Sequence, residues 1–292
     1  MEYVGPDPCR SCMTVSQIKL HDGTSIPQLG FGVFQVPPED TAATVAQAFE
    51  AGYRHIDTAQ MYQNEAGVGQ AIKDSSLARD ELYITSKLNN GFHRPDDART
   101  AIDESLERLG LEQTDLFLIH WPLPTKYDGD FVSTWQALIE AQQAGKTRSI
   151  GVSNFQPAHL DRIVEETGVV PVVNQVEVHP FFANEDVRAA NRRHGVLTEA
   201  WSPIAKGAVN DDDTIAEIAS LVGRTPAQVT LRWHLQRGDI IFPKSMKAER
   251  MRENLEIFDF ELSAQHVSAL DALDRGESGR TGPNPDTFDY IP

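Results

Sequence analysis

The chain has 292 residues, of which 40% are hydrophobic, and its 26 Lys and Arg against 43 Asp and Glu give a formal net charge of −17. A chain of this length can bury one large core, and α/β barrels of roughly 250 residues form a single domain. The negative charge argues against a nucleic-acid backbone or an anionic membrane as the main partner. An anionic cofactor would need a local basic patch.

The opening segment, residues 1–14, precedes any periodic pattern and contains both cysteines, Cys9 and Cys12. A C-x-x-C pair can bind a metal or exchange disulfides, but no strand leads into this one and no second Cys or His pair accompanies it. We interpret the segment as a disordered or non-native extension and take Met13 as the natural start. We expect no metal site.

No uninterrupted apolar run approaches the roughly 20 residues that a membrane helix needs. The start of the chain also lacks the basic-then-apolar pattern of a signal peptide. We therefore expect a cytoplasmic protein that binds neither membrane nor nucleic acid.

The periodic part begins with a predicted hairpin. Residues 18–20 and 25–27 are short apolar segments on either side of residues 21–24, which include the tight-turn signal Asp22-Gly23. Such a hairpin could plug one end of a barrel.

After the hairpin, short apolar runs alternate with amphipathic stretches. Eight of the runs are predicted strands, at residues 28–31, 54–57, 82–85, 116–119, 149–152, 172–176, 196–200 and 240–242. Helical patterns separate them, for example at residues 41–51, 96–109 and 131–144. The first and third of these lead into Gly52 and Gly145, and glycine is typical of a helix C-terminal cap.

Eight strands that alternate with helices predict a (β/α)8 barrel, formed by residues 15–292 as one domain with the hairpin as its plug. The alternative is an open, doubly wound sheet, which would carry a G-x-G-x-x-G turn after its first strand. Gly30 and Gly32 are present there, but the third glycine is missing. We therefore prefer the barrel.

Four ionisable or phenolic side chains fall at or just after successive predicted strand ends: Asp57, Tyr62, Lys87 and His120. The C-terminal ends of barrel strands meet at one face, so these groups should lie together. Tyrosine has a pKa of about 10, and a nearby ammonium lowers it. We expect Lys87 to supply that charge and Asp57 to hold Lys87. His120 would orient a carbonyl oxygen, and Tyr62 would act as the acid.

A proton donor beside a carbonyl serves either reduction, with hydride from a cofactor, or enolisation, which needs a further base. No second acid–base group stands out. Each residue alone also has a structural interpretation: Asp57 and Lys87 as a buried ion pair, Tyr62 as a rim aromatic, and His120 as a histidine bonded to backbone. Their joint occurrence at strand ends favours the chemical interpretation.

The chain resembles the aldo-keto reductases from about residue 18 to about residue 273. The resemblance rests on Lys87 and on the segments GYRHIDTAQMY at 52–62, IHWP at 119–122, IGVSNF at 150–155, NQVE at 174–177 and PKS at 243–245. Among the branches of the family, it looks most like the prokaryotic reductases that include the diketogluconate reductases. The resemblance implies a catalytic tetrad of Asp57, Tyr62, Lys87 and His120, with NADPH as the cofactor.

The resemblance also implies a site for the nicotinamide. Ser153, Asn154 and Gln175 match family positions that hydrogen-bond the carboxamide, a role that hydroxyl and amide groups suit. Trp201 matches an aromatic residue that stacks on the ring, although a core aromatic is the alternative. Further matched positions around the cofactor are Gly32, Val33, Phe34, Asp57, Ser202, Pro203 and Ile204.

The adenosine end of the cofactor would lie near a predicted helix at residues 249–258. By resemblance, the residues that hold the ribose phosphate and the adenine are Lys244, Ser245, Met246, Arg250, Glu253 and Asn254. Two cations and a hydroxyl near a helix start make an anion site even in an acidic protein, and they favour NADPH over NADH. A solvated basic helix face is the alternative.

The sequence departs from its relatives where substrate is chosen. Many relatives carry tryptophan soon after the tetrad lysine, whereas this chain has Asn89 there, so one aromatic wall is in doubt. The expected substrate-contacting residues surround the mouth of the barrel: Phe34, Tyr62, Asn89, Phe92, His120, Trp121 and Phe288. Phe288 would reach it from a C-terminal tail folded over the mouth.

Three functions remain open. The leading one is a monomeric enzyme that uses NADPH to reduce a small carbonyl compound: an aldehyde or ketone, such as a dicarbonyl, keto ester or keto sugar. The second is a cofactor-sensing regulatory barrel with little turnover. The third is a glycoside hydrolase that uses Glu177 and Glu199, whose carboxyl groups would have to lie roughly 5 to 9.5 Å apart.

Overall fold

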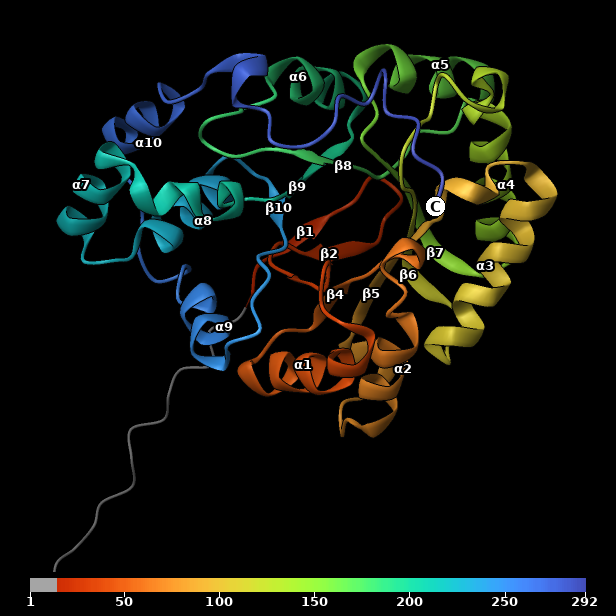
Figure 1. Ribbon diagram of the computed structural model, residues 1–292, viewed down its shortest axis with the longest axis horizontal. Helices are drawn as coiled ribbons and strands as arrows, with labels where there is room; N and C mark the ends of the chain where they lie inside the picture. Colours follow the sequence, from red (N-terminus) through yellow and green to blue (C-terminus); the bar gives the residue numbers. More distant parts are fainter. Residues whose placement is uncertain (1–14) are drawn as a thin grey trace, which may run out of the picture.

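The computed structural model describes residues 15–292 and shows eight parallel strands in one curled sheet, in sequence order (Figure 1). These strands are β3 (Phe31–Gly32), β4 (His55–Asp57), β5 (Tyr83–Leu88), β6 (Thr114–Ile119), β7 (Thr147–Ser153), β8 (Val173–Glu177), β9 (Leu197–Trp201) and β10 (Ile240–Ile241). A parallel bridge between Leu29 and Ile241 joins the two edges. The predicted (β/α)8 barrel is therefore confirmed.

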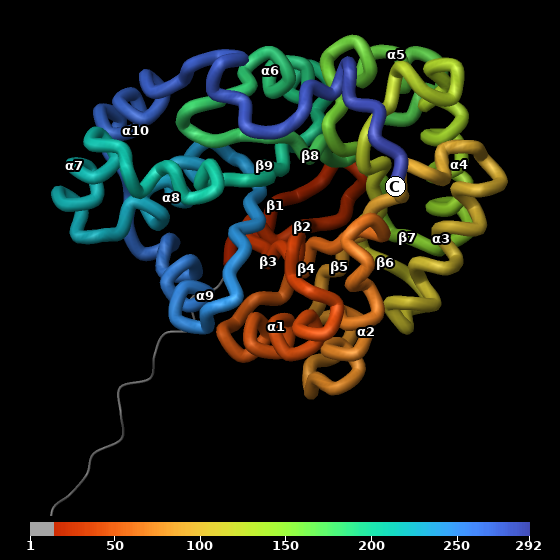
Figure 2. The backbone as a smooth tube through the Cα atoms, in the orientation of Figure 1, coloured from red at the N-terminus to blue at the C-terminus, as the bar shows by residue number. Residues whose placement is uncertain are grey.

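Helices surround the sheet and connect its strands (Figure 2). They are α1 (Pro38–Ala51), α2 (Glu65–Asp74), α3 (Pro95–Leu109), α4 (Phe131–Gln143), α5 (Pro157–Thr167), α6 (Glu185–His194), α7 (Asp213–Val222), α8 (Pro226–Gln236), α9 (Ala248–Leu255) and α10 (Ala264–Asp271). Gly52 caps α1 with a φ of 118°, as its position in the sequence predicts.

One predicted helix end needs correction, and a second one is confirmed. The helix expected at residues 249–258 ends at Leu255, because Glu256 leaves helical geometry and Ile257 turns inward to become fully buried. α4 ends at Gln143, one residue before the predicted end, and Gly145 follows the C-cap Ala144 with a φ of 77° and donates its N–H to the Gln142 backbone oxygen, so the glycine expected at this helix end is confirmed.

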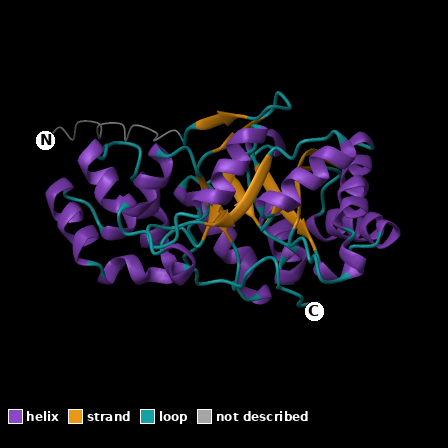
Figure 3. Cartoon of the chain, turned by 90° about the horizontal axis from the view of Figure 1, so that it is seen from above, coloured by secondary structure: helices purple, strands orange, loops and turns teal. Residues whose placement is uncertain are grey.

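The N-terminal hairpin is formed by β1 (Gln17–Lys19) and β2 (Ser25–Pro27), paired antiparallel. The Asp22 side chain accepts a hydrogen bond of 2.9 Å from the Thr24 backbone and stabilises the turn. Ile26 is fully buried and packs in one cluster with Leu20, Tyr83 and Leu116. The hairpin lies on the side of the barrel opposite the C-terminus, so it closes the end where the strands begin (Figure 3).

The beginning of α2 is held firmly, which matters because Tyr62 lies just before it. Glu65 is buried, and its carboxylate accepts hydrogen bonds from Ser86 at 2.5 Å, from Arg108 at 2.7 Å and from Ser105. Further along α2, a Cβ on Gly69 would lie 2.5 Å from the backbone oxygen of Leu109 at the end of α3. The glycine therefore permits a close approach of the two helices.

Replacing Gly69 with alanine should destabilise the protein, because the added methyl group would overlap the Leu109 backbone. The helix-propensity gain of about 1 kcal/mol is smaller than the 1–3 kcal/mol or more typical of overpacking. We expect a lower midpoint in urea unfolding. Gln70→Ala, an exposed site on the same helix, is the control and should change stability by less than about 0.5 kcal/mol. Equal midpoints for both variants and wild type would contradict the close packing of α2 on α3.

Candidate active site

The four residues predicted to work together meet at the end of the barrel where the strands finish. Asp57 is the last residue of β4, Lys87 lies near the end of β5, and His120 follows β6 directly. Tyr62 ends a short 3-10 turn, η1 (Gln60–Tyr62), between β4 and α2. The rings of Tyr62 and His120 meet edge-on, with centroids 5.6 Å apart.

Lys87 is the centre of this group. Its Nζ donates to Asp57 Oδ1 at 2.7 Å, to the Thr58 backbone oxygen at 2.9 Å and to Tyr62 Oη at 3.4 Å. Burial lowers the pKa of Lys87, but the neighbouring Asp57 and Tyr62 raise it, and the resulting pKa lies above the ordinary value. Lys87 is therefore a fully buried, charged ammonium.

The expectation that Lys87 brings the pKa of Tyr62 below its ordinary value is wrong. Burial raises the pKa of Tyr62, and although the charge and hydrogen bond of Lys87 lower it, burial prevails with help from Asp57. Tyr62 is thus a protonated phenol at neutral pH. It can still give its proton to a strongly basic oxygen such as an alkoxide, and Lys87 then stabilises the phenolate left behind.

His120 is a neutral imidazole. Burial and the nearby charge of Lys87 hold its pKa well below the ordinary value. Its Nδ1 is buried and has no hydrogen-bond partner among residues 15–292. A neutral ring can orient a ligand oxygen by donating one hydrogen bond, without adding a second positive charge beside Lys87.

The residues expected around the nicotinamide form one connected group, with Ser153 and Trp201 at the ends of β7 and β9 and Gln175 in the middle of β8. Ser153 Oγ donates to the Gln175 backbone oxygen at 2.8 Å, and Asn154 Nδ2 contacts Ser153 Oγ at 3.1 Å. Trp201 Nε1 donates to Asn154 Oδ1 at 2.9 Å. Asn154 has a φ of 63°, a conformation that asparagine tolerates better than most residues.

The remaining cofactor positions flank this group. Gly32 ends β3, where a Cβ would lie 3.2 Å from the Phe242 backbone oxygen. Val33 is buried, whereas the ring of Phe34 is 56% exposed and lies 5.1 Å from that of Tyr62. The segment after β9 comprises Ser202, Pro203 and Ile204, and the Pro203 backbone oxygen bonds to His234 of α8 at 3.1 Å.

The expected phosphate-binding segment lies between β10 and α9. Lys244, Met246 and Arg250 are exposed there, which leaves the two cations accessible to an anion. Ser245 is buried, and its hydroxyl accepts a hydrogen bond of 3.0 Å from the Lys247 backbone. The two residues expected near the adenine are less accessible to a ligand. Asn254 is buried, and the Glu253 carboxylate accepts a 2.6 Å hydrogen bond from the hydroxyl of Thr225, at the start of α8.

The C-terminal tail folds over the mouth, and its course across the strand ends is visible in Figure 2. The rings of Trp121 and Phe288 lie 4.1 Å apart, and Asn90 Nδ2 donates to the Tyr290 backbone oxygen at 2.9 Å. Phe92 is 38% exposed on the same rim. The backbone N–H of Asn89 donates a hydrogen bond of 2.7 Å to Gln60 Oε1.

Glu177 anchors the C-terminal tail, a role that the sequence did not indicate. Its carboxylate accepts bonds from the Thr281 backbone at 2.7 Å, the Thr281 hydroxyl at 2.6 Å and the Gly282 backbone at 2.9 Å. Burial raises the pKa of Glu177, but these bonds and one from His179 hold it below its ordinary value. Glu177 thus anchors the start of the tail, while Glu199 bonds instead to Gln175. This arrangement argues against a hydrolase that uses the two carboxyls as a pair.

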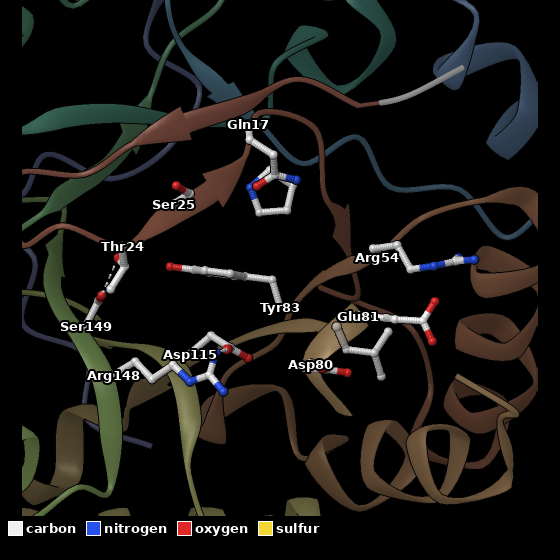
Figure 4. A pocket seen from close by; sticks show the side chains of 12 residues that line it. Gln17, Thr24, Ser25, Arg54, Asp80, Glu81, Tyr83, Asp115, Arg148 and Ser149 are labelled. Atoms are coloured by element: carbon white, nitrogen blue, oxygen red, sulfur yellow. Dashed lines mark hydrogen bonds and ion pairs between the residues drawn. The ribbon is translucent and has the colours of Figure 1, made fainter. Parts of the chain in front are cut away.

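A hollow of about 510 Å³ lies at the opposite end of the barrel, between the hairpin and the beginnings of the strands (Figure 4). Its lining includes Thr24, Tyr83, Asp115 and Arg148. It includes none of the four predicted catalytic residues, Asp57, Tyr62, Lys87 and His120. Within residues 15–292, no cluster of His, Cys, Asp or Glu is suited to hold a metal, and no helix is long and apolar enough to span a membrane. The predicted catalytic residues therefore lie away from this hollow, at the end where the strands finish.

The comparisons with known proteins agree on one family. A family model described as "Aldo/keto reductase family" matches residues 28–275. An aldo-keto reductase of Mycolicibacterium smegmatis is 47% identical over 274 residues, covering 94% of this chain and 98% of that protein. The methylglyoxal reductase DkgA of Escherichia coli K12 is 45% identical over 274 residues, covering 93% of this chain and 97% of that protein.

Solved structures are similar over nearly the whole chain. Gox0644 in its apo form superposes with a TM-score of 0.91 at 44% identity, covering 95% of this chain and 100% of that chain. A Gox0644 mutant in complex with NADPH has a TM-score of 0.90 at 44% identity and the same coverage of 95% and 100%. The chain therefore belongs to the aldo/keto reductase family.

Proposed function

We propose that this NADP-dependent aldo/keto reductase reduces small carbonyl compounds with Tyr62 as the proton donor, and that it prefers substrates with two neighbouring carbonyl groups. The observation that carries the proposal is the buried ammonium of Lys87, bonded to both Asp57 and Tyr62. The rest of the site supplies a place for the cofactor on one side and an aromatic mouth on the other.

The residues of the chain fit NADPH. Ser153, Asn154 and Gln175 offer hydroxyl and amide groups suited to a carboxamide, and Trp201 offers a partly exposed aromatic face beside them. The exposed cations Lys244 and Arg250 suit a phosphate. When bound, NADPH supplies the hydride that a carbonyl carbon accepts in reduction.

The four residues Asp57, Tyr62, Lys87 and His120 carry out the proton transfer to the substrate. Tyr62 Oη gives its proton to the substrate oxygen as that oxygen becomes basic, and the ammonium of Lys87 stabilises the phenolate that remains. Asp57 holds Lys87 in place. Neutral His120 orients the substrate oxygen by hydrogen bonding and so selects which face of the carbonyl is presented.

The preference for two carbonyl groups rests on Asn89. Its Oδ1 accepts a 2.9 Å bond from the Gly91 backbone, so the amide is oriented with Nδ2 as its remaining donor group. A donor at this place, where many relatives have tryptophan, suits a second oxygen on a short substrate. The name methylglyoxal reductase, which the E. coli relative bears, is consistent with an α-oxoaldehyde.

A cofactor-sensing barrel with little turnover is the second candidate. The contacts that join Asp57, Lys87 and Tyr62 argue against it, because a regulatory protein needs no phenol held against a buried ammonium. Steady turnover of NADPH with a carbonyl substrate would decide between the two functions.

Tyr62→Phe should abolish most of the activity, because it removes the proton but keeps the ring. General acid catalysis typically contributes 100- to 10,000-fold, so we expect a fall in kcat of about that size with methylglyoxal, measured by NADPH absorbance. Binding of NADPH, measured by quenching of tryptophan fluorescence, should persist. Tyr290→Phe, at a half-exposed tail position, is the control and should behave as wild type. A Tyr62→Phe enzyme with most of the wild-type rate would refute this role.

Arg250→Ala should weaken NADPH binding far more than NADH binding, because only NADPH carries the ribose phosphate. Loss of a charge-assisted hydrogen bond corresponds to an increase of about 10- to 100-fold in the KM for NADPH. Arg252→Ala is the control, since Arg252 is exposed on the same helix and lies two positions further on, on another face. Equal losses for both cofactors would assign Arg250 another role.

Asn89→Leu should discriminate between substrates. The variant loses the amide donor, so we expect the KM for methylglyoxal to rise about 3- to 10-fold, as for one neutral hydrogen bond. The KM for butanal, which has a single carbonyl, should stay within about twofold of wild type. An equal increase for both substrates would show that Asn89 does not recognise the second oxygen.

A further inference from the structure

Glu199 is a buried acid that the proton-transfer mechanism does not use. It lies in the middle of β9 with no exposed surface, next to Gln175 on the neighbouring strand β8. A carboxyl group inside a barrel needs a reason, because burial without partners is costly. Its only side-chain hydrogen bond among the described residues goes to Gln175.

Gln175 divides its amide hydrogens between two acids. Its Nε2 lies 2.9 Å from Asp57 Oδ2 and 2.9 Å from Glu199 Oε2. A primary amide has two N–H groups, so both are used. Turning the amide over would place its oxygen against the carboxylate of Asp57. Asp57 and Glu199 together therefore fix which end of the amide faces them.

The other end of the amide remains available. Gln175 Oε1 takes part in no hydrogen bond with the described residues, and it is not among the polar atoms that are closed off from solvent. The backbone oxygen of the same residue accepts a bond from Ser153, which in turn contacts Asn154. Gln175 Oε1 is thus an available acceptor close to the Ser153 hydroxyl and the Asn154 amide, which are suited to bind a carboxamide.

We propose that Glu199 is a positioning residue for the cofactor. By accepting one N–H of Gln175 while Asp57 accepts the other, it holds that side chain with its oxygen free to accept the N–H of the nicotinamide carboxamide. This inference rests on the proposed function, because it requires NADPH to occupy the site. It assigns Glu199 to cofactor orientation and gives it no part in proton transfer to the substrate.

The charge state of Glu199 is consistent with this role. Burial and the nearby charge of Asp57 raise the pKa of Glu199, the hydrogen bond of Gln175 and the charge of Lys87 lower it, and the resulting pKa is about 8. Tyr83 is a further titratable group near this carboxyl, and the charge of Glu199 raises the pKa of Tyr83. At neutral pH Glu199 is therefore mainly uncharged, so it serves as an acceptor without adding a second negative charge beside Asp57.

A binding experiment tests the proposal with two variants and two cofactors. Glu199→Gln keeps an oxygen acceptor for Gln175, whereas Glu199→Met removes it at similar volume. The probes are NADPH and reduced 3-acetylpyridine adenine dinucleotide phosphate, whose acetyl group has no N–H to donate. Dissociation constants are measured by fluorescence quenching or calorimetry, independently of turnover.

We expect Glu199→Met to weaken NADPH binding about 3- to 10-fold, the size of one neutral hydrogen bond. The same variant should bind the acetylpyridine analogue within about twofold of wild type, and Glu199→Gln should bind both as wild type does. Equal weakening for both probes, no weakening for either, or Glu199→Gln behaving like Glu199→Met would each overturn the proposal. If Glu199→Met does not fold, Glu199→Ala takes its place. Failure of wild type to bind NADPH would instead refute the proposed function.

The pH dependence of the melting temperature, measured without cofactor, gives a second test, which asks whether Glu199 is buried beside Asp57. Because the folded-state pKa of Glu199 is about 8 and the ordinary value is 4.5, the wild type loses stability as the pH rises from about 5 through 8. Glu199→Gln has no such proton to lose, so its melting temperature should rise relative to wild type across this range. Parallel curves for the two proteins would show that Glu199 does not lie buried beside Asp57 and would overturn the inference.

Discussion

The ammonium of Lys87 is a charge held inside the barrel with no exposed surface. An unpaired charge in such a place would cost several kcal/mol, so the fold has to bring acceptors to it. It does so with Asp57 from the neighbouring strand and with the backbone oxygen of Thr58. The third contact, to Tyr62, places the phenol at the same point. The need to satisfy one buried cation therefore aligns β4, β5 and the η1 turn.

Asp57 connects the two halves of the site. One of its carboxylate oxygens accepts from Lys87 and the other from Gln175. The group that steadies the proton donor is thus also the group that orients the amide of Gln175. A change in the position of Lys87 or of Gln175 would therefore affect the other residue through the carboxylate that both contact.

Much of this arrangement could be predicted because it follows from local patterns. The strand ends at Asp57, Lys87 and His120 are visible in short apolar runs, and a parallel barrel brings such ends together. The pKa of Tyr62 could not be predicted, since it depends on how deeply the phenol is buried. The role of Glu177 was equally hidden, because its partner Thr281 lies 104 residues further along the chain.

The tail, whose start is anchored to Glu177 through Thr281, finishes beside the mouth, where Tyr290 meets Asn90 and Phe288 covers Trp121. Anything fused after Pro292, such as an affinity tag or a linker to a solid support, would start within a few residues of the substrate entrance. Immobilisation through that terminus would crowd the entrance and press on the aromatic cover. A carrier joined to the exposed face of α7, for example near Leu221, would leave the entrance unobstructed.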